Sequence, residues 1–185
     1  MEYLTQPEVK ALLTVAYEHN RDHHLALLTL YATGTRVSQA LKLTGFDIIP
    51  DHVAGGHKIR MPKAKRGFSR TFPVVASPDP VLDMSPLVER ARVRGSSLLF
   101  GGLDRHYLHR VIKKYATLAG LHGDIVHAHT LRHSTAMRIW EKTQRAGAIT
   151  GYLCHTDQSS VYPYLREHDA SLGADVMVEV LTSAA

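Results

Sequence analysis

The sequence predicts a mostly helical α+β fold that contains one small three-stranded antiparallel sheet. Apolar residues recur every three or four positions over several long segments, and this periodicity is typical of amphipathic helices. Between residues 46 and 75 the helical pattern gives way to three short segments bounded by glycine, proline and aspartate, as in small strands. With 185 residues, 44% of them hydrophobic, the chain is long enough for one hydrophobic core. We therefore expect residues 1–185 to form a single domain.

The individual elements are predicted from apolar spacing and from residue types that favour helix ends. Thr5, Pro7 and Glu8 are typical of a helix start, and apolar residues follow at helical spacing from Val9. A Thr-Gly-Thr break at residues 33–35 separates the second helix from the third. Further helices are predicted at residues 21–31, 36–43, 85–94, 105–118, 130–142 and 147–153, and strands at 46–49, 58–61 and 71–75. The apolar stripe of the helix at 105–118 contains Tyr107, Leu108, Val111, Ile112 and Tyr115.

Composition excludes several classes of protein and leaves the partner open. Cys154 is the only cysteine, so an intramolecular disulfide cannot form. No apolar run approaches the roughly 20 residues that span a bilayer, and the first residues lack the apolar core of a signal peptide. Lys and Arg number 22 against 17 Asp and Glu, a net charge of +5 that suits a polyanionic partner without identifying one. We expect a cytoplasmic protein with no membrane partner.

The segment from His127 to Ser134, His-Ala-His-Thr-Leu-Arg-His-Ser, has the highest density of chemically active side chains. On the first turn of a helix, Arg132 and the backbone N–H groups could bind a phosphate together. A zinc site is a second interpretation, since His129 and His133 have i, i+4 spacing, but the segment has neither an HExxH motif nor a nearby cysteine. A solvated histidine-rich turn is the third interpretation.

Four separated motifs then occur in a fixed order. They are Thr-Gly-Thr-Arg at 33–36, a basic hairpin at 62–73, His-Thr-Leu-Arg-His at 129–133, and Leu-Cys-His at 153–155 with a tyrosine nine residues after the histidine. Together with the interval of 22 residues from His133 to His155, they resemble the catalytic domain of the tyrosine recombinases, the phage-integrase family. The resemblance spans nearly the whole chain and implies that family's fold.

The resemblance implies that four residues surround a DNA phosphate. Arg36 and Arg132 match the two family arginines that clamp the non-bridging oxygens and stabilise the charge of the transition state. His129 and His155 match the flanking histidines, which donate hydrogen bonds to the phosphate or exchange protons with the nucleophile. No cofactor and no metal ion is implied, because the covalent intermediate conserves the energy of the broken bond.

The nucleophile and the general acid each have an alternative. Tyr164 matches the family nucleophile because of its interval from His155, while Tyr162 would take that role if the intervening loop were two residues shorter. Lys65 matches the lysine that protonates the 5′-oxygen leaving group, and Lys63 is its competitor in the same hairpin. The implied catalytic set is Arg36, Lys65, His129, Arg132, His155 and Tyr164.

Three positions depart from the family pattern. Gln39 replaces an acid that often orients the first arginine, although glutamine can still accept a hydrogen bond. Cys154 and Thr143 stand where glycines are usual. The family's separate N-terminal domain, which clamps the other face of the DNA, has no counterpart here, so we expect residues 1–185 to be the catalytic domain alone.

The resemblance implies a site-specific recombinase or integrase that forms a 3′-phosphotyrosyl link to double-stranded DNA. We expect a homo-oligomer, a tetramer, on DNA and a monomer without it. We expect it in the cytoplasm in association with the nucleoid, or in the host cytoplasm if a mobile element or virus encodes it. An apolar helical pattern at residues 169–181 is a candidate for docking to a neighbouring protomer or for packing on its own core. Two other functions stay open: a type IB topoisomerase-like DNA relaxase, and an inactive DNA-binding module with the same fold.

Overall fold

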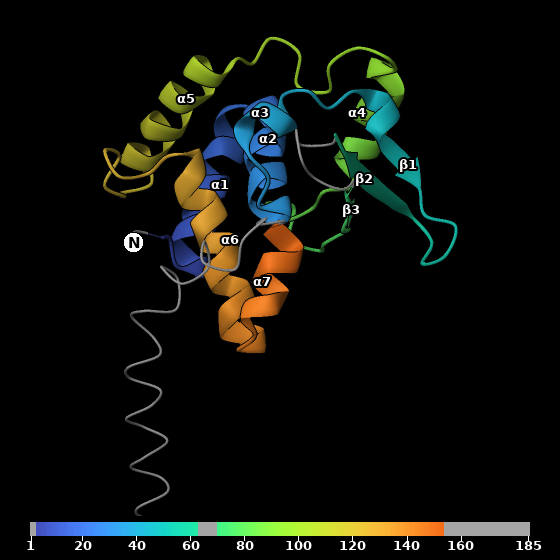
Figure 1. The fold of residues 1–185 in the computed structure, drawn as a ribbon. Coiled ribbons are helices and arrows are strands. Elements are labelled where there is room, and N and C mark those ends of the chain that lie inside the picture. Colours follow the sequence, from blue (N-terminus) through green and yellow to red (C-terminus); the bar gives the residue numbers. More distant parts are fainter. Residues whose placement is uncertain (1–2, 63–69, 154–185) are drawn as a thin grey trace, which may run out of the picture. The chain divides into compact units, whose positions relative to one another are not determined.

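A computed structural model describes residues 3–62 and 70–153 (Figure 1). Internal contacts divide the chain into two compact units, one that runs up to Thr135 and one that begins at Ala136. The first unit contains helices α1 to α5, the sheet and the start of α6, and the described part of the second contains the rest of α6 and α7. No helix among the described residues is long and apolar enough to cross a membrane.

Helices α1 (Gln6–His19) and α2 (Arg21–Thr33) pack against each other in the first unit. The predicted start of α1 is confirmed, because Thr5 and Glu8 form a capping box. Asn20 ends α1 and starts α2, and its side-chain oxygen accepts hydrogen bonds from the N–H groups of Asp22 and His23. The two helices bury a shared apolar core whose members include Leu12, Leu13, Leu27 and Leu30.

The predicted sheet is present, with small shifts at the strand ends. Strands β1 (Ile48–Pro50), β2 (His57–Met61) and β3 (Arg70–Pro73) pair antiparallel in the order β1-β2-β3. Ile59 lies opposite both Ile48 and Phe72, and this row is buried. The first strand begins two residues later than predicted because Gly45–Asp47 forms a 3₁₀ helix, η1, capped by Thr44.

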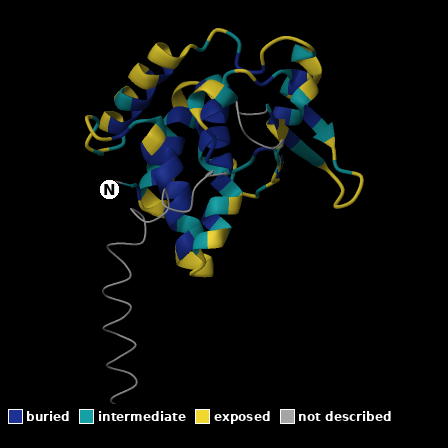
Figure 2. Cartoon of the chain, viewed as in Figure 1, coloured by how far each residue is buried: buried dark blue, intermediate teal, exposed yellow. Residues whose placement is uncertain are grey.

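The third predicted helix, at residues 36–43, is wrong in its extent. Only α3 (Val37–Ala40) is helical, Arg36 has extended backbone angles, and the chain turns at Leu41. Helices α4 (Pro86–Arg94) and α5 (Arg105–Leu118) follow the prediction closely. Within the predicted stripe of α5, Tyr107 is 37% exposed, whereas Leu108, Val111, Ile112 and Tyr115 are buried. Figure 2 shows that α5 as a whole has both exposed and buried residues along its length.

Helices α6 (Ala128–Thr143) and α7 (Ala146–Leu153) also match their predictions within two residues. Between them Gln144 has φ 51°, a left-handed conformation that favours glycine, so the turn beside Thr143 is made without one. The N–H of Gln144 donates to the carbonyl oxygen of Trp140 and ends α6. The segments around 162–165 and 169–181 lie outside the described residues.

Candidate active site

The turn that presents Arg36 begins where α2 ends. Gly34 takes left-handed backbone angles, φ 57° and ψ 20°, which end the helix without the cost that a side chain would add. The hydroxyl of Thr33 donates to the Thr29 carbonyl at 2.7 Å and accepts from the N–H of Thr35 at 3.3 Å. This local network directs Arg36 out of the core, where its side chain is exposed and forms no ion pair with a described residue.

Arg132 lies on α6 beneath this turn and is only 1% exposed. Its Nη1 donates a hydrogen bond to the carbonyl oxygen of Gly34. The next turn of α6 also contacts α2, since the hydroxyl of Thr135 donates to the Tyr31 carbonyl of α2 at 2.6 Å. The two predicted arginines are therefore linked through the backbone of one turn, with Arg132 supporting it and Arg36 projecting from it.

The first turn of α6 is capped by a side chain, which corrects one expectation. The Nδ1 atom of His127 accepts hydrogen bonds from the N–H groups of His129 and Thr130, each at 3.2 Å. The sequence alone predicts that these N–H groups bind a phosphate. Because His127 satisfies two of the orphan donors at this helix end, a phosphate here has to be bound chiefly by side chains.

His129 and His133 pack edge to face on successive turns of α6, with ring centroids 4.6 Å apart. Burial lowers the pKa of His129, and nearby cations, Arg132 first, lower it further. His133 is 9% exposed, and burial followed by the charges of its histidine neighbours lowers its pKa to about 4. Both rings are therefore mainly neutral at pH 7, the state in which an imidazole can donate one hydrogen bond and accept a proton.

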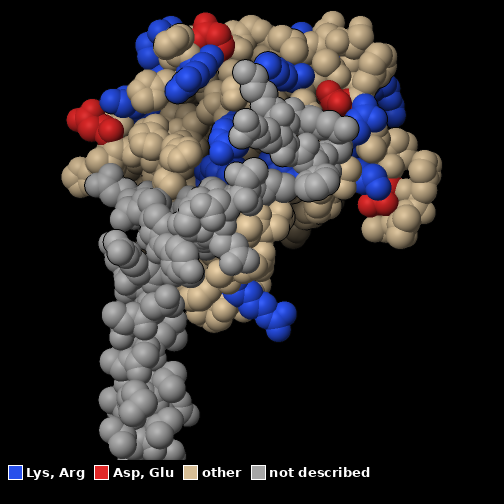
Figure 3. Space-filling view, viewed as in Figure 1, with Lys and Arg blue, Asp and Glu red and all other residues tan. Residues whose placement is uncertain are grey.

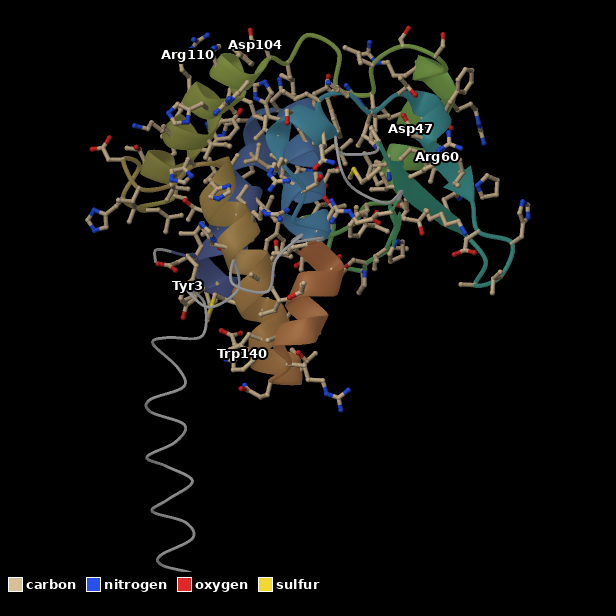
Figure 4. The ribbon with its side chains drawn as sticks, viewed as in Figure 1. Tyr3, Asp47, Arg60, Asp104, Arg110 and Trp140 are labelled. Carbon is tan, nitrogen blue, oxygen red and sulfur yellow. The ribbon has the colours of Figure 1, made fainter. Side chains whose placement is uncertain are left out.

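A cavity of about 670 Å³ joins two of the predicted residues, Arg36 and His129. Helix α5 forms another part of its lining through Arg105, His106 and His109. Asp104 caps α5 by accepting from the N–H of Tyr107 at 2.7 Å, and it lies at the end of that helix in Figure 4. On the face shown in Figure 3, Lys and Arg side chains lie at several separate places, with Asp and Glu side chains among them.

Sequence reasoning missed the contribution of α5 to this cavity. The basic residues Arg105, His106 and His109 lie at positions i, i+1 and i+4, a spacing that keeps the first and last on one helix face. The signal was present, but nothing in the sequence placed that face beside Arg36. Arg36 and Arg105 therefore bring two positive charges to the cavity wall, which suits an anion.

The zinc interpretation has no support in the described ranges. Within residues 3–62 and 70–153, no three His, Cys, Asp or Glu side chains are arranged to hold a metal ion. The Nδ1 of His127 is already occupied by the two backbone donors of α6.

The model of the Phage integrase family matches residues 2–171 of the chain. The chain belongs to the phage integrase family. Tyrosine recombinase XerA of Pyrococcus furiosus is 32% identical to this family member over 171 residues, which are 88% of this chain and 56% of the relative. A tyrosine recombinase of Pseudothermotoga lettingae is 27% identical over 91% of this chain and 57% of its own length. The chain thus spans just over half the length of these curated relatives.

Solved structures of the phage integrase family have the same fold. XerH bound to a palindromic difH substrate, in a post-cleavage complex, aligns with a TM-score of 0.74 at 21% identity, over 95% of this chain and 52% of that one. The lambda integrase catalytic core aligns with a TM-score of 0.63 at 19% identity, over 83% of this chain and 91% of that one. The prediction of a tyrosine recombinase catalytic-domain fold is confirmed.

In this phage integrase family member the structure brings three of the six predicted catalytic residues to one place. Arg36, His129 and Arg132 surround the turn after α2 and the start of α6. Lys65, His155 and Tyr164 lie outside the described residues, as do the alternatives Lys63 and Tyr162.

Proposed function

We propose that this chain is the catalytic domain of a site-specific DNA recombinase that cleaves and rejoins DNA through a 3′-phosphotyrosyl intermediate. The observation that carries the proposal is the turn after α2, where exposed Arg36 projects toward the cavity and buried Arg132 holds the backbone behind it. Arg36 on this turn and Arg132 bonded to it from α6 can together stabilise the negative charge that develops on a phosphate oxygen. The order of the four sequence motifs supports the same assignment.

The reaction balances without a cofactor. The Tyr164 oxygen attacks phosphorus, a bond forms between them, and the bond to the 5′ oxygen breaks. Lys65 gives a proton to the departing 5′ oxygen, and the phenol proton passes to a neighbouring base such as a neutral histidine. Attack by a 5′-hydroxyl from the same or another strand reverses these steps and restores the tyrosine. Arg36 contributes by binding the phosphate, since it forms no ion pair with a described residue.

The cavity lining accounts for binding of DNA beyond one phosphate. Arg105 and His106 lie at the start of α5, on the same cavity as Arg36. Basic side chains on a shared wall can contact the phosphates that flank the one being cleaved, and such contacts supply most of the affinity for DNA. We assign double-stranded DNA as the partner on this basis.

Assembly follows from the chemistry of strand exchange. Two duplexes must be cut and rejoined with each other, so several protomers have to act on one complex. A structural neighbour of this chain is a lambda integrase tetramer bound to a Holliday junction, with a TM-score of 0.64. As part of the proposal, we assign a tetramer on DNA to this chain as well. Residues 1–185 would form one catalytic domain in each protomer, and the tetramer would act on the nucleoid.

A nicked duplex substrate tests the proposal. Cleavage next to the nick releases a short fragment, so religation fails and the covalent protein–DNA complex accumulates. The proposal predicts a complex that survives denaturing electrophoresis with the wild-type chain and disappears with Arg36→Ala. DNA binding without any covalent product would favour the inactive binding module. Covalent product with relaxation of supercoiled DNA but no exchange between duplexes would favour the topoisomerase-like function.

A further inference from the structure

Gln39 connects the turn before Arg36 to the end of strand β2. Its side-chain Oε1 accepts a hydrogen bond from the hydroxyl of Thr35 at 3.2 Å. Its Nε2 donates to the carbonyl oxygen of Pro62 at 3.3 Å. Thr35 is 1% exposed and Gln39 is half-buried, so both bonds lie at the edge of the core. One amide therefore bridges Thr35 and Pro62. Pro62 lies 23 residues after Gln39 in the sequence.

Pro62 is the point at which the chain leaves the sheet. The paired register of β2 with β3 ends at Met61 opposite Arg70, so the Pro62 carbonyl lies beyond the last pair of the ladder. The next residue in the sequence is Lys63, and Lys65 follows two residues later. Gln39 therefore ties Pro62, the described residue that precedes Lys63 in the sequence, to the turn that carries Arg36.

This arrangement uses a property that an acid does not have. An amide has both a donor and an acceptor, whereas an ionised carboxylate has acceptors only. A glutamate at position 39 could still accept from Thr35, but it would bring a negative charge against the Pro62 carbonyl oxygen and donate nothing. Glutamine, which departs from the family pattern at this position, is thus the residue that can make both contacts.

We propose that Gln39 is a positioning residue for protonation of the leaving group. It anchors Pro62, from which the chain continues to Lys63 and Lys65, and it makes no hydrogen bond with Arg36 within the described residues. Its loss should therefore disturb delivery of the proton to the 5′ oxygen more than binding of the phosphate. This inference rests on the proposed recombinase function.

The test compares two nicked duplexes that differ in one bridging atom. One has the ordinary 5′ oxygen at the cleaved bond and the other has sulfur, whose thiol has a pKa of about 8.5, so it leaves without a proton donor. The variants are Gln39→Glu, which keeps the acceptor and removes the donor, and Gln39→Met, which removes both without adding charge. Gln6→Glu makes the same charge change at an exposed position of α1 and is the matched control.

We expect both Gln39 variants to cleave the oxygen substrate about 10- to 100-fold more slowly than wild type, since small misplacements of a catalytic group cost up to about 10²-fold. On the sulfur substrate their rates should return to about the wild-type rate, as should those of Lys65→Ala if that lysine is the acid. Gln6→Glu should match wild type on both substrates.

Equal slowing on both substrates would overturn the inference, because the contact would then act on the phosphate clamp. Wild-type rates for both Gln39 variants on the oxygen substrate would overturn it as well. Thermal unfolding of each variant identifies a chain that has failed to fold, and the second variant then decides the question. Absence of any covalent product from the wild-type chain would count against the proposed function instead.

Discussion

The buried guanidinium of Arg132 donates a hydrogen bond to the carbonyl oxygen of Gly34, two residues before the exposed Arg36. This contact gives the two arginines different physical roles within one site. Arg132 supports the backbone of the turn in addition to any contact with DNA, whereas Arg36 is available to an incoming phosphate. The two side chains should therefore respond differently to the same substitution.

Lysine in place of Arg36 should abolish most of the activity without affecting folding. An ammonium cannot reproduce the planar two-point contact of a guanidinium with phosphate oxygens. Loss of one contact of this kind costs about 3–4 kcal/mol in the transition state, or roughly 10²–10³ in rate. Cleavage of the nicked duplex measures the rate, and the free energy of unfolding should stay within about 0.5 kcal/mol of wild type. Cleavage near the wild-type rate would show that Arg36 does not hold the phosphate.

Arg132→Lys should lower both cleavage and stability. The shorter, differently shaped cation loses the bond to the Gly34 carbonyl inside the core, and a buried hydrogen bond to a charged group is worth about 1.5–3 kcal/mol. Chemical denaturation should show a loss of about 2 kcal/mol in the free energy of unfolding. A variant as stable as wild type would contradict the supporting role assigned to this side chain.

Alanine at Gly34 should damage the site through the backbone. The left-handed conformation costs a residue with a side chain about 1–2 kcal/mol, and the Arg132 bond depends on the same peptide. Gly120 is the matched control, since it has φ 74° and open space where a side chain would project. Both alanine variants should lose about 1 kcal/mol or more of stability, but only Gly34→Ala should slow cleavage. Equal cleavage rates for the two variants would argue against a role for this turn in catalysis.

The stability of the chain should fall as the pH drops from about 6.5 to about 4. Burial lowers the pKa of His133 from 6.5 to about 4. Between these two pH values the unfolded state binds a proton at His133 and the folded state does not, so protonation favours unfolding. The stabilising contribution is fully present above pH 6.5 and is lost as the pH falls through the folded pKa. At one pKa unit per 1.36 kcal/mol, it amounts to about 3 kcal/mol.

Unfolding of wild type and His133→Asn, measured between pH 7.5 and 4, isolates this effect from the other buried histidines. The variant should lose less stability with falling pH than wild type does. Parallel curves for the two proteins would show that His133 is not held neutral by the fold.

The sequence was sufficient where local spacing decides structure. Thr5 with Glu8 and the apolar stripe of α5 specify helices by themselves, and both are present. It failed where tertiary contacts decide: the helix predicted at 36–43 shrinks to Val37–Ala40, because Arg36 and Leu41 serve a turn rather than a helix. Tyr107 fits the apolar stripe by spacing but lies at its exposed edge.

The candidate site also has features that the sequence predicts and features that depend on tertiary contacts. Motif order marked Arg36, His129 and Arg132, and the structure gathers them. The capping role of His127 depends on which way its ring turns, and the cavity wall from α5 depends on packing between elements distant in sequence. Neither is encoded in a short motif. The donor role of Gln39 depends on the position of the Pro62 carbonyl, which only the fold brings near.

The covalent adduct itself tests the central claim most directly. After reaction of the wild-type chain with the nicked duplex, nuclease trimming and proteolysis leave a peptide that carries a nucleotide, and mass spectrometry locates the modified residue. The account predicts a single adduct on Tyr164, absent from Tyr164→Phe although that variant still binds DNA, because one hydroxyl adds little to a phosphate-dominated interface. An adduct on Tyr162 would contradict the assignment of the nucleophile, and the absence of any tyrosine adduct would contradict the proposed reaction.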